Sequence, residues 1–160
     1  MPKTIKRLLD IELTEPCAGW ASIIFTWKYD TKRSKIYTEQ YGFSYVKSTP
    51  IDLLNMIENI YKDEFQENIH GITMDQEDAG ELLLVINDWY VLLYNINDSE
   101  RHHLFLYGDN FSRLTLCKRL LEYLEKYSDK WVKNFLLDDI NQEEFNQKIK
   151  SIKNILGGSI

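Results

Sequence analysis

The chain lacks the short motifs that mark many enzymes and cofactor-binding proteins. Its 7 glycines are scattered, and neither GxxxxGK[ST] nor GxGxxG occurs, so no glycine-rich phosphate loop is present. There is no GxSxG, and neither Cys17 nor Cys117 has a histidine nearby in sequence, which is the usual local context of a catalytic nucleophile. These absences favour a protein that is not an enzyme and that holds no cofactor.

Long hydrophobic runs and paired cysteines are also missing. The 2 cysteines have no CxxC spacing, which predicts reduced thiols in a cytoplasmic protein, although one disulfide could form if they met in the fold. The longest apolar stretch, residues 82–96, is interrupted by Asn87 and Asp88 and is shorter than the roughly 18 residues needed to span a bilayer. Asp10 and Glu12 interrupt any apolar segment behind the first basic residues, so we expect no signal peptide and no membrane contact.

Basic residues are scarce in the middle of the chain. The net charge of the chain is -6. Residues 1–50 contain 8 Lys/Arg and 5 Asp/Glu, a net charge of +3, and residues 111–160 contain 9 Lys/Arg and 7 Asp/Glu, a net charge of +2. Residues 51–110 contain 2 Lys/Arg and 13 Asp/Glu, a net charge of -11. Phosphate contacts require Lys and Arg, so the acidic middle argues against nucleic-acid binding there. It is compatible with a basic protein partner.

Three short apolar runs lie between Glu81 and Tyr107, separated by polar turn-forming residues. This pattern predicts three consecutive strands, with Asn87-Asp88 as a two-residue hairpin turn. In the first two runs both alternating sets of side chains are apolar. Such strands are typical of the middle of a sheet, so we expect them to be covered on both faces.

Period-two alternation predicts further strands before this centre, at residues 5–13, 20–30 and 35–46. A helix is the alternative for the first of these, because Leu8 and Leu9 blur its alternation. Residues 69–74 allow a short edge strand.

Apolar residues at helical spacing predict one helix after Thr49 and several more in the last third of the chain. Thr49 is expected as the N-cap of the first, and Asp109 or Asn110 as the N-cap of the second. Asn141 with Glu144 predicts a capping box at the start of the last helix.

These elements predict an α+β fold in a single domain spanning residues 1–160. A mainly antiparallel sheet of about five to seven strands should be covered by one central helix and a C-terminal helical group. Many of the chain's aromatic residues fall on the predicted strands, where core filling is the default interpretation.

The acidic residues around the central strands are the predicted partner-binding surface. They are Asp75, Glu77, Asp78, Asp98 and Glu100. The loop that contains the first three does not match a calcium loop, because its glycine falls late and Gln76 interrupts the alternate ligand positions. We therefore expect no metal there.

The adjacent histidines His102 and His103 are the other candidates. Neighbouring strand residues point to opposite faces, so the two rings cannot readily share one metal ion. His103 could instead line a small-molecule pocket or act as a general base, together with Tyr107, Tyr90 and Trp89.

The sequence thus supports three functional hypotheses. The first is a non-enzymatic acidic module that binds a basic protein, such as an immunity protein that inhibits a toxin or nuclease. The second is a small-ligand-binding protein or enzyme that uses the His103 pocket. The third is a subunit of a larger assembly, which predicts a large exposed apolar patch and self-association.

Overall fold

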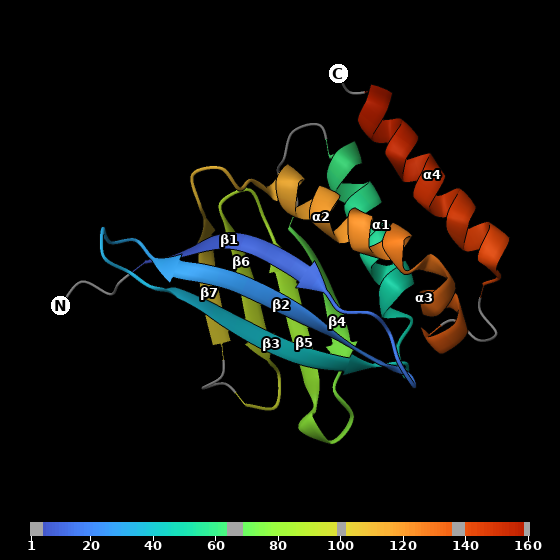
Figure 1. Ribbon diagram of the computed structural model, residues 1–160, viewed down its shortest axis with the longest axis horizontal. Helices are drawn as coiled ribbons and strands as arrows, with labels where there is room; N and C mark the ends of the chain where they lie inside the picture. The colour runs from blue at the N-terminus through green and yellow to red at the C-terminus, as the bar shows by residue number, and fades with distance from the viewer. Residues whose placement is uncertain (1–4, 64–68, 99–101, 136–139, 159–160) are drawn as a thin grey trace.

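A computed structural model describes residues 5–63, 69–98, 102–135 and 140–158 and shows one sheet with helices gathered at one end (Figure 1). The strands are β1 (Lys6–Leu13), β2 (Trp20–Tyr29), β3 (Ile36–Ser44), β4 (His70–Asp75), β5 (Glu81–Ile86), β6 (Tyr90–Asn95) and β7 (His102–Tyr107). The helices are α1 (Thr49–Lys62), α2 (Arg113–Lys126), α3 (Ser128–Phe135) and α4 (Gln142–Gly158), with a short 3₁₀ turn at Glu77–Ala79. None of the helices in the described ranges is both long enough and apolar enough to cross a membrane.

The strands form a 7-stranded sheet in the order β3-β2-β1-β7-β6-β5-β4. Every neighbouring pair is antiparallel except β1 and β7, which run parallel with Lys6 opposite Phe105. The predicted α+β fold with a mainly antiparallel sheet is therefore confirmed. The parallel pair joins an N-terminal meander to a second meander formed much later in the chain.

The sheet is curled into an open barrel, with β1–β3 in front of β4–β7 in Figure 1. Its two edge strands meet at one end, where the Ser44 hydroxyl donates to Asp75 Oδ1 at 3.2 Å and Gln76 Nε2 donates to the Gly42 carbonyl at 3.0 Å. Across the interior, the rings of Phe25 and Phe105 stack with centroids 5.7 Å apart. The curl gives the sheet an inner face that surrounds the core and an outer face that looks away from it.

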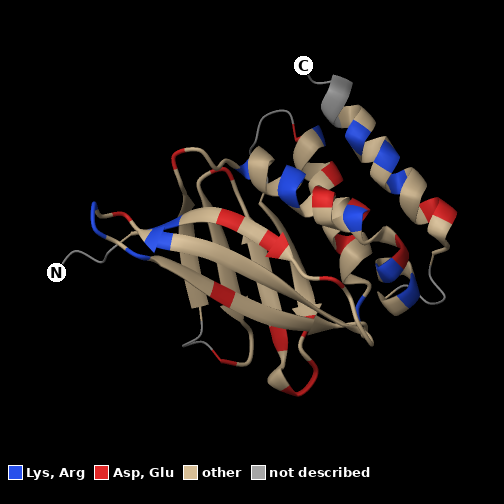
Figure 2. Ribbon diagram, viewed as in Figure 1, with Lys and Arg blue, Asp and Glu red and all other residues tan. Residues whose placement is uncertain are grey.

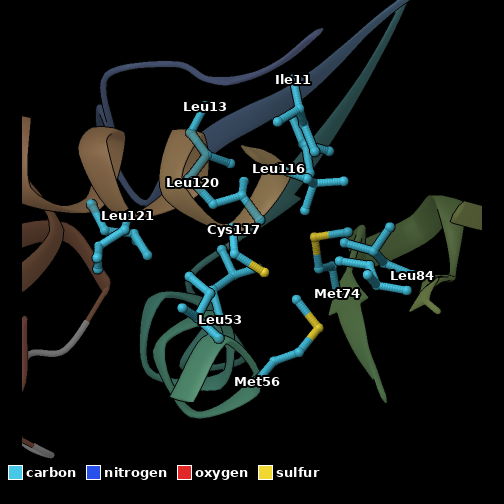
Figure 3. Packing of buried hydrophobic residues seen from close by; sticks show 14 of the residues in the cluster. Ile11, Leu13, Leu53, Met56, Met74, Leu84, Leu116, Cys117, Leu120 and Leu121 are labelled. Atoms are coloured by element: carbon cyan, nitrogen blue, oxygen red, sulfur yellow. The ribbon is translucent and has the colours of Figure 1, made fainter. Parts of the chain in front are cut away.

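The helices lie at one end of this barrel (Figure 1), and Figure 3 shows the packing of buried side chains there. There, apolar side chains from α1, α2 and the inner faces of the strands pack together without exposure to solvent; among them are Ile11, Leu13, Leu53, Met74, Leu84, Leu116, Cys117 and Leu120. Because burial of each such side chain contributes about 1.5–3 kcal/mol, this cluster holds the helices to the sheet.

The expectation that the central strands are covered on both faces is wrong for one of their two sets of side chains. On β5 and β6 the inner residues are buried, whereas Leu83, Val85, Leu92 and Tyr94 on the outer face remain partly exposed. The helices lie at the end of the barrel and not over this outer face (Figure 1).

The turn between β5 and β6 also differs from the expected Asn87-Asp88. The Asn87 amide donates to the Tyr90 carbonyl at 3.0 Å, so the two residues at the tip are Asp88 and Trp89. Trp89 is therefore placed on the turn and is 77 % exposed.

Helix caps are partly as expected. Asn141 Oδ1 accepts from the Glu144 amide at 2.9 Å, which confirms the predicted cap of α4. The N-cap of α2 is Ser112, whose hydroxyl accepts from the Thr115 amide at 3.2 Å, so neither expected residue caps that helix. The N-cap of α1 is Ser48, one residue before the expected Thr49.

Candidate functional site

The outer face of β5, β6 and β7 is apolar. In register across the three strands, Val85 lies beside Leu92 and Leu92 beside Leu104, which is 51 % exposed. We call this surface the outer apolar face; its members are Leu83, Val85, Tyr90, Leu92, Tyr94, Leu104 and Leu106.

The outer face of the other half of the barrel is mostly polar. On β2 it carries Ser22, Thr26 and Lys28, and on β3 it carries Thr38 and Gln40. Its apolar residues, Trp20, Ile24 and Ile36, are separated by these polar ones. A solvent-facing sheet surface normally alternates in this way, with polar residues outward. The contiguous leucines, valine and tyrosines on β5–β7 therefore mark a surface that is suited to contact with another molecule.

Trp89 lies at one end of the outer apolar face, on a turn that is fixed by hydrogen bonds. Trp89 sits at the tip of the β5–β6 turn, where its amide donates to Asn87 Oδ1 at 2.7 Å. The Tyr107 hydroxyl donates to the Asn87 carbonyl at 2.7 Å, and Asp88 pairs with Arg113 of α2 at 3.1 Å. These contacts tie the turn to the body of the protein, so the exposed indole is presented by a supported loop.

The predicted acidic residues gather at the opposite end, which we call the acidic end: Asp75, Glu77, Asp78 and Asp98. Two loops meet there, because Asn95 Nδ2 donates to Gln76 Oε1 at 3.4 Å and the β6 end leads directly into the turn that holds Asp98. The ribbon of Figure 2 shows acidic positions in red along the loop that joins β4 to β5. Glu100, the fifth predicted residue, lies outside the described residues.

Not all of these acids are free to meet a partner. Asp75 Oδ1 accepts from the Ser44 hydroxyl at 3.2 Å and from the Glu77 amide at 2.7 Å, so Asp75 also fixes the loop. The side chains of Glu77 and Asp78 are exposed. They are the best placed of the group to meet a basic partner.

The four residues of the predicted His103 pocket are not brought together. His103 and Tyr107 lie on the inner face of β7, and the Tyr107 hydroxyl donates its hydrogen bond to the Asn87 carbonyl. Tyr90 lies opposite Leu106 on the outer face, and Trp89 is at the turn. As expected, His102 and His103 point to opposite faces, since His102 pairs with Tyr94 and His103 with Leu93.

His103 instead lies in the open mouth of the barrel with two residues that sequence reasoning missed. Its Nδ1 is 3.0 Å from Lys6 Nζ, and its Nε2 is 3.9 Å from Glu39 Oε2. Its ring stacks on Phe105 with centroids 5.4 Å apart. Burial and the nearby Lys6 charge lower the pKa of His103, which keeps the imidazole neutral at neutral pH.

Comparison with known proteins gives no identification of these sites. No family model, curated protein or solved structure matches this chain. The outer apolar face and the open mouth are therefore interpreted from their own geometry.

Metal and thiol chemistry have little support in the described part of the chain. Within it, no cluster of three or more His, Cys, Asp or Glu side chains is arranged to hold a metal ion. Cys17 is exposed and Cys117 is buried between α1 and α2, and both are free thiols. Burial raises the pKa of Cys117 to about 12, which keeps it protonated and unreactive.

Proposed function

We propose that this protein is a non-enzymatic binding module that holds a basic protein partner against the outer apolar face. The observation that carries the proposal is the exposure of Leu104 at 51 %, within a row of apolar residues that none of the described helices covers. Contiguous apolar surface of this kind on a soluble domain is typical of a protein interface.

The proposed interface has the composition of known contact surfaces. Tyrosine and tryptophan are enriched among the residues that dominate binding free energy, and Tyr90, Tyr94 and Trp89 all belong to this face or its edge. The main-chain hydrogen bonds of β5–β7 keep the face ordered, so little conformational entropy is lost on binding.

Charge supports a basic partner. The acidic end extends the outer apolar face with exposed Glu77 and Asp78, and residues 51–110 carry a net charge of -11. Complementary charge speeds association and discriminates against acidic competitors. A second copy of this chain is a poorer occupant, because two molecules of net charge -6 repel one another.

Within this class, an immunity-type protein that inhibits a toxin or nuclease fits best. A nuclease has a basic active site made to hold a phosphate backbone, and an acidic surface beside an apolar anchor can occupy such a site. The free thiols Cys17 and Cys117 support a reducing compartment such as the cytoplasm.

The test is affinity capture from the native host with two matched pairs of variants. Leu104→Lys disrupts the outer apolar face, and Ile36→Lys, on the outer edge of β3 and 65 % exposed, is its control. A double variant, Glu77→Lys with Asp78→Lys, reverses the charge of the acidic end. Its control is Glu143→Lys, which reverses an exposed charge on α4, away from both surfaces.

A stoichiometric basic protein should bind the wild type and both control variants. Leu104→Lys should weaken binding at least about tenfold, as expected for a central interface residue. The double charge reversal should weaken binding at low salt and have less effect at high salt, because exposed charges are screened. If Leu104→Lys and Ile36→Lys bound the partner equally well, the outer apolar face would not be the interface.

Self-association is distinguished by sedimentation velocity on the purified chain. A monomer that forms a complex only with the captured protein supports the proposal. A wild-type dimer that Leu104→Lys converts to monomer would replace the basic partner with a second copy of this chain.

A further inference from the structure

The open mouth of the barrel, at the end away from the helices, holds a cavity on the inner side of the sheet. It has a volume of about 630 Å³ and is lined by residues of β1, β3, β6, β7 and the loop after β4, among them Lys6, Glu39, Tyr41, Gln76, Asn95 and His103. This size falls within the ~300–1,000 Å³ that is typical of small-molecule sites. The cavity shares no side chain with the outer apolar face.

Lys6 brings a positive charge into this cavity. Its Nζ lies 3.0 Å from His103 Nδ1 and 5.0 Å from the centre of the Trp27 ring. Within the described residues these two neutral rings are its contacts, so the ammonium has no carboxylate partner there. A lysine ammonium has three donors, and those not used by His103 can bind an anionic group.

His103 adds a second donor beside Lys6. An ammonium can only donate, so His103 Nδ1 must accept, and the neutral ring then carries its hydrogen on Nε2. Glu39 Oε2 is 3.9 Å from Nε2, which is too long for a direct hydrogen bond. The Nε2 hydrogen is thus available to an acceptor atom of a ligand placed near Lys6.

Glu39 determines which kind of anion fits. Its carboxylate lies on the edge strand β3, close to the Lys6–His103 pair, and would repel a simple anion. A ligand that carries an ammonium next to its carboxylate avoids this repulsion, because its ammonium can pair with Glu39. The ring of Tyr41, which also lines the cavity, offers an aromatic surface to the same cation.

We propose that this mouth cavity binds the zwitterionic head group of a free α-amino acid. The ligand carboxylate accepts from Lys6 Nζ and His103 Nε2, and its ammonium donates to Glu39. The aromatic layer beneath, in which Trp27 stacks on Tyr37 at 4.6 Å between centroids, holds Lys6 and His103 in place. This site is independent of the proposed function and can be tested on the isolated protein.

The experiment begins with ligand-observed NMR of the standard amino acids at neutral pH, followed by calorimetry on those that bind. The strongest binder is then compared with its deaminated and decarboxylated analogues. Both analogues should bind at least about tenfold more weakly, since the deaminated analogue loses its charge-assisted bond to Glu39 and the decarboxylated analogue loses those from Lys6 and His103. Failure of every amino acid to bind below about 10 mM would overturn the proposal.

Variants assign the two halves of the head group. Lys6→Met should weaken binding at least about tenfold, and Lys28→Met, on the outer face of β2, is its control. Glu39→Gln should remove the preference for the amino acid over its deaminated analogue, and the exposed Glu12→Gln is its control. Circular dichroism identifies any variant that fails to fold, and Glu39, on an edge strand, is the safer of the two positions.

Other outcomes would contradict the site. If the deaminated analogue bound as tightly as the amino acid, the cavity would be a simple anion site and the role of Glu39 would be wrong. Equal losses in Lys6→Met and Lys28→Met would place the ligand elsewhere. Leu104→Lys should leave amino-acid binding unchanged, which separates this result from the test of the outer apolar face.

Discussion

Because the two faces of β6 differ in burial, we expect the same Leu→Ala substitution to lower the free energy of unfolding by different amounts at Leu92 and Leu93. Leu93 points inward and is 1 % exposed, whereas Leu92 points outward between Val85 and Leu104 and is partly exposed. Leu93→Ala removes buried methyl groups and leaves a cavity in the core, for which about 3 kcal/mol is expected. Leu92→Ala loses only the contacts with its two outer neighbours, and about 1 kcal/mol is expected.

Urea unfolding followed by circular dichroism measures both free energies. For a chain of this size, the losses correspond to roughly 6–12 °C in Tm for Leu93→Ala and roughly 2–4 °C for Leu92→Ala. The two residues have the same chemistry and the same strand, so the comparison isolates the difference between the faces. If both variants lost about 3 kcal/mol, the outer face would be covered in solution, and the proposed interface would have to be abandoned.

Three further predictions concern individual residues. Burial lowers the pKa of His103 below its ordinary value of 6.5. As the pH falls, the imidazole is therefore protonated in the unfolded chain before it is protonated in the folded one. The folded state then loses stability below about pH 6.5. His103→Phe should therefore lose less stability than wild type between about pH 7.5 and about pH 5.5, as measured by urea midpoints. A thiol reagent should label Cys17 in the native protein and Cys117 only after denaturant is added; native labelling of both would show that the core around α2 opens. Gly80 has φ +97°, and a Cβ there would lie 2.5 Å from Asn97 Cγ. Gly80→Ala should therefore lower the free energy of unfolding by about 2 kcal/mol, measured by heat or urea. An unchanged midpoint would contradict this geometry.

Local periodicity was enough to predict the fold class and most of the strands, although it only allowed β4 and left a helix open for β1. On β2 the alternation from Ala21 to Tyr29 predicts which side chains face the core, and the structure buries Ile23, Phe25 and Trp27 on that face. It was not enough to predict what covers the second face of β5 and β6. An apolar residue has the same pattern whether its cover comes from its own chain or from another molecule, so Leu83 and Leu92 could not be recognised as only partly buried.

The mouth cavity was beyond sequence reasoning for a different reason. Lys6 and His103 are 97 positions apart and meet only because β1 pairs in parallel with β7. Glu39 reaches the same mouth because the sheet curls toward its own edge. Strand order and curvature arise from non-local pairing, which a pattern of neighbouring residues does not contain. His103 alone could be singled out, and its predicted neighbours Trp89 and Tyr90 proved to lie elsewhere.

β7 connects the two proposed sites, and its geometry also keeps them separate. His103 and Phe105 face the interior, and Leu104 between them faces out, because successive strand residues alternate. A partner on the outer apolar face therefore contacts a strand whose other side forms a wall of the mouth cavity. Side-chain substitutions on one face leave the other intact, but a shift of the β7 backbone would move both. If a partner changes the affinity for an amino acid by some factor, the amino acid must change the affinity for the partner by the same factor. A Leu104 variant that no longer binds the partner should still bind the amino acid, with an affinity that the partner no longer changes.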